Sequence, residues 1–420
     1  MLGQTLKILK VIHGFPPDFM AGSEVYSFTL CKELAKMGHR VFVFTRVENE
    51  FDEPYTIYDE SYMNGEFLKA QNFEDTSPNA LSIRRINKPK DYTYRAKFYD
   101  DRLEAQFRAY LEQVQPDIVH FGHLAHLSIN LVKIAKACNK PVVFTLHDFW
   151  LYCVRGQLID SKLSLCNAPS TEKCLSCSPY HTLESEVKQA LGHLQEVRED
   201  IDMFISPSHT LKDYFIKQGI PAQKILYQKY GFDKESITYK KRIFKAQDSV
   251  RFGYMGRIIP TKGIKVLLEA FCLLHATYPK QKLRIYGDIG KSKRFLQEDF
   301  VEFMGGYDNG DINKILQGLD VLIVPSIWLE NSPLVIQEAF LAGVAVVSAD
   351  IGGMRELIAN GRGLCFQAGN ASSLANVLEQ ILQNPSILNA LPDNRECVDS
   401  IQKDCKATLS LYARLLKEKQ

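Results

Sequence analysis

Residues 325–338 read Pro-Ser-Ile-Trp-Leu-Glu-Asn-Ser-Pro-Leu-Val-Ile-Gln-Glu and place Glu330 and Glu338 eight positions apart. The apolar run just before them, Val321–Val324, predicts a buried strand. The Ser-Pro pair at 332–333 suits an N-cap followed by the first helical residue, so a helix is expected to begin there. One glutamate then lies in the loop before the helix and the other in its second turn.

The start of this predicted helix offers free backbone N–H groups and the positive end of a helix dipole, which together favour an anion. Two carboxylates flank that position. The arrangement indicates a ligand that carries hydroxyl groups on both sides of a phosphate. For the two glutamates taken alone, an exposed helix face is the alternative.

Two further loops follow predicted strands in the same half of the chain. Gly256–Gly263 contains two cations, Arg257 and Lys262, which suit a diphosphate, although a solvated basic loop is the alternative. Gly352–Glu356 begins with two glycines and allows close backbone approach, although a plain strand–helix turn is the alternative. Because all three loops follow strands, we expect them at one edge of one sheet.

Apolar runs alternate with helical stretches throughout the chain, and this predicts parallel sheets with crossover helices. The pattern restarts after a Lys-rich stretch near residue 240. We therefore predict an α/β protein with two Rossmann-like, doubly wound domains that face each other across a cleft holding the ligand. The predicted parts are a first domain (1–232), with an irregular insertion (48–100) and a Cys-rich loop (150–180), a second domain (233–400), and a last helix that returns to the first domain (401–420).

Composition limits the classes of function. A chain of 420 residues with 45% hydrophobic and 24% charged residues is typical of a globular protein with two domains. A net charge of +2 argues against nucleic acid as a partner. No apolar run approaches the ~20 residues of a membrane span, and Lys7–Ile12 resembles a first strand more than a leader peptide. We expect a cytoplasmic location, with peripheral contact at the inner face of the membrane left open.

Four cysteines lie close together in the sequence, and two of them have the C-x2-C spacing of metal ligands. They could bind a structural zinc ion, form disulfides, which a reducing cytoplasm disfavours, or stay unlinked. All three readings remain open for Cys153, Cys166, Cys174 and Cys177.

These motifs together resemble the group-1 family of retaining glycosyltransferases with the two-Rossmann-domain (GT-B) architecture. The second half carries Gly256-Arg257, Lys262-Gly263, the Glu-x7-Glu pair and the run from Glu338 to Gly343. The first half is similar to the family in other segments: Phe15-Pro-Pro, Gly22-Ser-Glu24, Leu34–His39, Asp117–His120, Thr145–Asp148 and Ser206–Ser208. The resemblance covers nearly the whole chain except residues 48–100.

The resemblance implies that the donor is held by Gly22, Arg257, Lys262, Glu330, Asn331, Ser332, Pro333, Leu334 and Glu338. Arg257 and Lys262 would bind the diphosphate, and Glu330 would contact the donor sugar or the phosphate region. Glu338 would accept hydrogen bonds from the ribose, and the backbone at 332–334 would cap the phosphates.

The first loop departs from the family pattern, which often has two glycines where this chain has Ala21 before Gly22. Alanine suits that position only if its φ is negative.

Three histidines follow predicted strands and are candidates for the catalytic centre together with Glu330. His120, His123 and His147 could each bind sugar hydroxyls or stabilise charge. The alternative is a histidine whose ring is held by the protein itself. The family's histidine falls in the region of His120–His123.

The resemblance therefore implies transfer of a sugar, with retention, from a UDP- or GDP-sugar to a hydroxyl of a glycan or lipid-linked acceptor. No cofactor is expected for catalysis, and no carboxylate pair suggests a double displacement. The alternatives are a synthase of a small soluble glycoside or sugar phosphate, and a non-catalytic nucleotide-sugar-binding protein.

Overall fold

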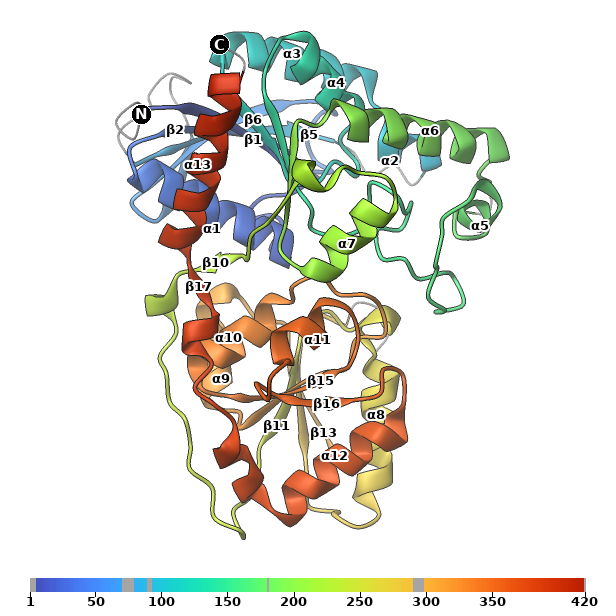
Figure 1. Cartoon of the computed structure of the whole chain (residues 1–420), viewed down its shortest axis with the longest axis vertical. Coiled ribbons are helices and arrows are strands. Elements are labelled where there is room, and N and C mark those ends of the chain that lie inside the picture. Colours follow the sequence, from blue (N-terminus) through green and yellow to red (C-terminus); the bar gives the residue numbers. More distant parts are fainter. Residues whose placement is uncertain (1–4, 70–78, 89–92, 180, 290–297, 419–420) are drawn as a thin grey trace. The chain divides into compact units, whose positions relative to one another are not determined.

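The computed structural model describes residues 5–69, 79–88, 93–179, 181–289 and 298–418, which form two compact units (Figure 1). Unit 1 comprises Met1–Ser161, Cys166–Phe232 and Ser400–Gln420, and unit 2 comprises Lys162–Leu165 and Asp233–Asp399. Apart from Lys162–Leu165, the chain leaves unit 1 after Phe232 and returns to it at Ser400. The domain boundaries predicted from the sequence follow residues 232 and 400. Each unit is an α/β structure, as predicted.

Unit 1 is built on a nine-stranded sheet. From edge to edge its strands are β4 (Glu66–Lys69), β3 (Ile57–Met63), β5 (Leu81–Asn87), β2 (Arg40–Val47), β1 (Lys7–Val11), β6 (Ile118–Phe121), β7 (Val142–Thr145), β8 (Met203–Ser206) and β9 (Ile225–Tyr227). The strands from β5 to β9 pair in parallel, whereas β3 is antiparallel to both of its neighbours. Strands β1 and β6 meet at the point where the chain reverses its direction of travel across the sheet.

The expected irregular insertion at 48–100 is wrong in its main part, because it contains β3, β4, β5 and the short helix α2 (Tyr94–Phe98). Its pattern was obscured by Arg84 and Arg85 in the middle of β5. Arg85 is buried, and it donates to Glu60 at 2.8 Å and to the Pro16 carbonyl at 2.5 Å. Residues 70–78 and 89–92 of that insertion lie outside the described residues.

Helices cover both faces of the unit 1 sheet, as right-handed crossovers in opposite directions require. Helix α1 (Gly22–Lys36) packs against α13 (Ile401–Glu418), and α4 (Asn130–Ala137) packs between α3 (Asp101–Val114) and α6 (Glu184–Asp200) (Figure 1). The last helix is therefore part of unit 1. Its Asp404 accepts hydrogen bonds from the Gln228 side chain at 2.5 Å and from the Gly231 amide at 2.8 Å. The remaining helices of this unit are α5 (Thr171–Ser176) and α7 (His209–Lys217).

Unit 2 contains a six-stranded parallel sheet. Its strands, in order, are β13 (Val301–Gly305), β12 (Leu283–Tyr286), β11 (Phe252–Met255), β14 (Val321–Val324), β15 (Ala345–Ala349) and β16 (Leu364–Phe366). The helices are α8 (Ile264–His275), α9 (Ile312–Gln317), α10 (Leu334–Ala342), α11 (Gly352–Ile358) and α12 (Ala371–Gln383), with α12 packed on α8 and α10 packed on α9 and α11 (Figure 1). Strands β11 and β14 are neighbours although two strands separate them in sequence, so the switch point of this sheet lies between them.

Strand β10 (Gly231–Phe232) pairs with β17 (Asp399–Ser400) in a two-stranded sheet. These strands lie where the chain leaves unit 1 and where it returns to it. In the described part of the chain, no helix combines the length and the apolar character that crossing a membrane requires.

Candidate functional site

The three loops picked out in the sequence follow β11, β14 and β15, which are adjacent strands of unit 2. In a parallel sheet the carboxyl ends of all strands lie at one edge, so these loops share that edge. It includes the switch point between β11 and β14, where open α/β sheets bind their ligands. The expectation of one shared edge is confirmed.

Glu330 and Lys262 form an ion pair across the switch point. Lys262 Nζ lies 2.5 Å from Glu330 Oε1. The same oxygen accepts hydrogen bonds from Ser326 Oγ at 2.7 Å and from Trp328 Nε1 at 3.0 Å. Among the described residues, the other carboxylate oxygen, Oε2, has no hydrogen-bond donor. Ser326 and Trp328 were not predicted as site residues, although both stand within the run 325–338.

Glu338 is buried, but its surroundings differ from those of Glu330. It lies in α10 with 8% of its surface exposed. Within the described part of the chain, no hydrogen bond or ion pair reaches its carboxylate. Burial raises its pKa from 4.5 to about 7. One glutamate is thus anchored, and the other is a desolvated carboxyl group close to half ionised at neutral pH.

The start of α10 differs slightly from the prediction. The helix begins at Leu334, so Pro333 rather than Ser332 is the N-cap residue. Ser332 does not cap the helix with its side chain; its Oγ accepts a hydrogen bond from Gln337 Nε2 at 3.1 Å. The N-cap residue, Pro333, makes no side-chain hydrogen bond to the amides at this helix end. Asn331, directly before them, is 97% buried, with 3% of its surface exposed.

Two glycines bring the loops of this edge together. Gly263 has φ +73°, and a Cβ there would lie 1.8 Å from the Pro325 carbonyl oxygen. A Cβ on Gly353 would lie 1.5 Å from the Asn331 carbonyl oxygen, and its own amide donates to the Glu330 carbonyl at 2.7 Å. Only glycine permits such backbone contact. Close backbone approach was predicted for the loop of Gly353 but not for Gly263, and the two glycines together join the three loops to one another.

Arg257 lies in the loop after β11, and its backbone is fixed by a neighbouring strand residue. Tyr254, which is buried, donates from its hydroxyl to the Arg257 carbonyl at 2.7 Å. The guanidinium of Arg257 belongs to a largely exposed side chain. The backbone at Arg257 is therefore fixed by the buried Tyr254 of β11, while the Arg257 side chain is open to solvent.

In unit 1 the corresponding switch point, between β1 and β6, carries a polar cluster. The rings of His13 and His123 lie 4.4 Å apart. His13 Nε2 lies 3.2 Å from Glu24 Oε1, and His123 Nε2 lies 3.3 Å from Asp148 Oδ2. Burial opposes ionisation of Glu24, but hydrogen bonds from His13 and Ser23 outweigh it and lower its pKa to about 2. We call His13, Glu24, His123 and Asp148 the unit 1 polar cluster.

The three candidate catalytic histidines have different surroundings. His120 is fully buried, with Nδ1 2.6 Å from the Tyr412 hydroxyl and Nε2 2.7 Å from Thr145 Oγ1. His147 Nδ1 lies 2.7 Å from the Tyr230 hydroxyl. Burial lowers the pKa of both His120 and His147 well below 6.5. The expectation that His120 faces an open ligand site is wrong, because both ring nitrogens are used inside unit 1.

His123 accepts a hydrogen bond on Nδ1 from the Ala125 amide at 3.1 Å, so Nε2 carries the proton shared with Asp148. It alone of the three candidates belongs to the unit 1 polar cluster. His13 and Asp148 were missed as site residues, although each follows a predicted strand. Gly22 begins α1 next to this cluster, and Ala21 before it has φ −77°, the negative value that alanine accepts.

Cys153, Cys166, Cys174 and Cys177 are all unlinked in the structure. Over the described residues, no three side chains of Cys, His, Asp or Glu are arranged to hold a metal ion. As placed, these thiols do not fit a zinc site, and the zinc and disulfide readings stay predictions. Burial raises the pKa of the Cys174 thiol to about 11.

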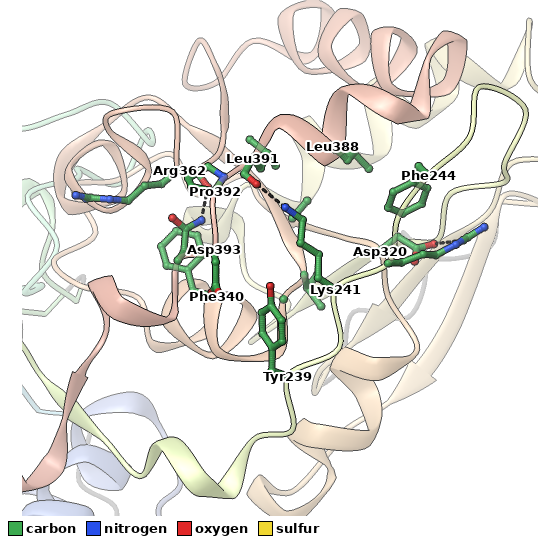
Figure 2. A pocket seen from close by; sticks show the side chains of 15 residues that line it. Tyr239, Lys241, Phe244, Asp320, Phe340, Arg362, Leu388, Leu391, Pro392 and Asp393 are labelled. Atoms are coloured by element: carbon green, nitrogen blue, oxygen red, sulfur yellow. Dashed lines mark hydrogen bonds and ion pairs between the residues drawn. The ribbon is translucent and has the colours of Figure 1, made fainter.

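A cavity of about 400 Å³, its open mouth included, lies elsewhere in unit 2 (Figure 2). It is lined by Asp320 and Val344, which directly precede β14 and β15, so it lies at the edge opposite to the three loops. Two of the cations that line it have partners in the protein. Lys241 donates to the Leu391 carbonyl, and Arg242 pairs with Asp320 at 3.1 Å (Figure 2). This cavity is therefore packing around the connector to unit 2 rather than part of the candidate site.

Two family models match this chain, one in each half. The family model described as Glycosyltransferase Family 4 matches residues 20–235, and the model described as glycosyl transferases group 1 matches residues 235–397. The chain is 28% identical to a glycogen synthase of Mycobacterium tuberculosis over 91% of this chain and 87% of that one. It is 27% identical to the amylovoran biosynthesis glycosyltransferase AmsK of Erwinia amylovora over 63% of this chain and 68% of that one.

Among solved structures, HepE of Anabaena in complex with UDP and glucose superposes with a TM-score of 0.64. The match covers 97% of this chain and 100% of the other at 16% identity, which establishes a shared fold. The family expected from the motifs is confirmed over both halves of the chain. The chain belongs to the group-1 glycosyltransferases, and its two Rossmann-like units are those of the GT-B fold.

Proposed function

We propose that this chain transfers a sugar, with retention of configuration, from a UDP- or GDP-sugar to a hydroxyl of a glycan or lipid-linked acceptor. The observation that carries the proposal is the contrast at the unit 2 switch point. Lys262 is fixed by Glu330, while the Glu338 carboxylate is buried without a partner among the described residues. A ligand that donates hydrogen bonds to such a group offsets the cost of burying its charge.

In this proposal Arg257, Lys262 and the amides at the start of α10 bind the diphosphate. The two cations and the helix N-terminus favour the negative charge that develops as the sugar leaves. Glu338 accepts hydrogen bonds from the ribose hydroxyls, and the unanchored Oε2 of Glu330 accepts from the donor sugar. The structure of HepE with UDP and glucose supports a nucleotide-sugar as the class of donor.

The chemistry proposed is a front-face substitution. The acceptor oxygen forms a bond to the anomeric carbon on the side from which the diphosphate leaves. The bond from that carbon to the phosphate oxygen breaks, and the leaving phosphate takes the acceptor proton. The residues named above supply charge stabilisation and position, and none of them is required as a covalent nucleophile.

We assign the acceptor to the unit 1 polar cluster. Its carboxylates accept hydrogen bonds from hydroxyl groups, and its histidine rings present apolar faces, which is a combination suited to a carbohydrate. His123 then orients an acceptor hydroxyl indirectly by holding Asp148. The relatedness to AmsK and to a glycogen synthase supports an acceptor that belongs to a polysaccharide pathway.

Thermal unfolding of the purified chain with UDP-, GDP- and ADP-sugars identifies the nucleotide, because a ligand stabilises the folded state according to its affinity. The stabilising donor is then incubated with candidate acceptors, and the anomeric configuration of the product is determined by NMR. We expect retained configuration and loss of transfer in Glu338→Ala. An inverted product, or a chain that binds donors without transfer to any glycan or lipid-linked acceptor, would contradict the proposal.

A further inference from the structure

Trp328 is 7% exposed and touches both members of the ion pair in unit 2. Its Nε1 donates to Glu330 Oε1 at 3.0 Å, and Lys262 Nζ lies over the indole, 5.7 Å from the ring centroid. The indole therefore supports the carboxylate by its N–H group and the ammonium by its π face. Ser326, 1% exposed, adds a second neutral donor to the same oxygen at 2.7 Å.

The two oxygens of the Glu330 carboxylate have different surroundings. Oε1 receives the ammonium, the indole N–H and the hydroxyl, and charge-assisted bonds of this kind are stronger than neutral ones. Considering only described residues, Oε2 receives no donor. A carboxylate held at one oxygen by three donors has a fixed plane, so the direction of its other oxygen is also fixed.

The backbone around these groups is connected in the same way. The Ile327 amide donates to the Thr261 carbonyl at 3.0 Å, which ties the loop of Trp328 to the loop of Lys262. The Glu330 amide donates to the Trp328 carbonyl at 2.8 Å. Both loops are thus held before any ligand arrives, and the side-chain bonds decide where the Lys262 ammonium lies within them.

We propose that Trp328 and Ser326 are positioning residues of the donor site. By holding Glu330 Oε1 they fix the Lys262 ammonium for the diphosphate and leave Oε2 for the donor sugar. Neither residue touches the reacting atoms. This inference rests on the proposed function, because it gives Lys262 and Glu330 their roles toward a nucleotide-sugar.

Trp328→Phe keeps an aromatic face for Lys262 and removes the N–H donor together with part of the ring volume. Ser326→Ala removes only the hydroxyl. A single hydrogen bond to a charged group corresponds to about tenfold in rate, so we expect each variant to lower kcat about tenfold. The donor KM should change less than about threefold, because the lost bond acts on the charge that develops as the diphosphate leaves.

The decisive measurement is a double-mutant cycle with Lys262→Met. If Trp328 acts through Lys262, Trp328→Phe should cost less than about twofold when Lys262 is already replaced. Equal costs in both backgrounds would overturn the inference, since they would indicate a general effect on the loop. Wild-type kcat in both Trp328→Phe and Ser326→Ala would also overturn it.

The same proteins separate this inference from the proposed function. UDP affinity is measured by calorimetry, and folding is checked by thermal unfolding. A wild-type chain that neither binds nor transfers from nucleotide-sugars would remove the proposed function itself. An active wild type with unaffected variants removes only the positioning role. If Trp328→Phe fails to fold, the positioning role is tested by kcat of Ser326→Ala and by the double-mutant cycle of Ser326→Ala with Lys262→Met.

Discussion

Lys262 Nζ lies 2.5 Å from Glu330 Oε1, and this ion pair joins the loop after β11 to the loop after β14 in unit 2. With side chains 23% and 7% exposed, the pair is largely shielded from water. Its members are therefore coupled more strongly than in an exposed pair. Removing either one leaves the other as a desolvated, uncompensated charge.

The first prediction concerns the charge of Lys262. Lys262→Met should lower kcat/KM for the donor by about two orders of magnitude, because one charge that stabilises the leaving diphosphate is lost. Steady-state transfer measures this loss. Lys265→Met is the matched control, since Lys265 is an exposed residue in α8 whose partner is Glu269 at 3.7 Å. Near-normal turnover in Lys262→Met would show that the ammonium does not act on the diphosphate.

The second prediction concerns the pH dependence of nucleotide binding. The ribose hydroxyls should bind the ionised form of Glu338, whose pKa is raised to about 7 by burial. UDP affinity should therefore increase as the pH rises from 6 to 8, with a limit of about tenfold per pH unit below the pKa. Calorimetric titration of wild type and Glu338→Gln tests this. An equally steep profile in the glutamine variant would assign the effect to another group.

The stability of the ligand-free protein should decrease as the pH rises, whereas UDP affinity increases. Between pH 4.5 and about 7 the unfolded chain has lost the Glu338 proton while the folded chain still holds it. Stability therefore falls as the pH rises through this window. Glu338→Gln should remove that fall, so its unfolding midpoint should exceed that of wild type at pH 8 and match it near pH 4. A variant that is less stable than wild type at pH 8 would contradict the raised pKa.

The third prediction tests the contact between two backbones. Gly263→Ala places a Cβ 1.8 Å from the Pro325 carbonyl, so the loops after β11 and β14 must separate. We expect a loss of stability well above the ~1 kcal/mol of a positive φ alone, together with weaker UDP binding. Gly369→Ala is the control, because its φ is +75° against +73° and a Cβ there meets no atom within 4 Å. Equal losses in the two variants would mean that conformational strain alone explains the effect.

Much of the unit 2 site was predictable from the sequence because its residues stand directly after strands that the sequence pattern identifies. The spacing of Glu330 and Glu338, the cations after β11 and the glycines each follow a strand, and parallel strands bring their ends to one edge. The partners of Glu330 were not predictable in this way. Nothing local to Trp328 shows that its N–H points at a carboxylate two residues away.

In unit 1 the sequence was a poorer guide because charged residues interrupt apolar patterns. Arg84 and Arg85 hide the buried strand β5, since their partners are recognisable only when the neighbouring strand is in place. His120 looked like a ligand-facing residue at a strand end. Its partner Tyr412 is 292 positions away in sequence, and only the packing of α13 reveals the contact.

The fourth prediction follows from that contact. Tyr412→Phe leaves His120 Nδ1 buried without its hydroxyl partner, which should cost about 1–3 kcal/mol of stability. Because neither residue contacts the proposed donor groups, kcat of the folded variant should stay within about twofold of wild type. Thermal unfolding and turnover on the same sample measure both quantities. A large fall in kcat without a fall in stability would return His120 to the catalytic candidates.

The last prediction concerns Lys10, a β1 residue that pairs in register with His120 of β6. Its side chain is 1% exposed, and its Nζ has no hydrogen-bond partner among the described residues. Burial lowers its pKa from 10.5 to about 8, although Cys31 and Asp404 oppose the shift. Below pH 8 both folded and unfolded chains carry the charge, so the folded state bears the full cost of a buried ammonium.

Lys10→Met should therefore stabilise unit 1 at pH 7 by up to about 3 kcal/mol, the equivalent of the pKa difference. Between pH 8 and 10.5 the unfolded chain binds the proton that the folded chain has released, so wild-type stability rises and the advantage of methionine shrinks. Unfolding midpoints at pH 7 and pH 10 measure the two differences, with the exposed Lys406→Met of α13 as control. If Lys10→Met is destabilising at pH 7, the ammonium has a favourable role in the fold, and the space between β1, α1 and α13 then holds a partner for it, such as a buried water.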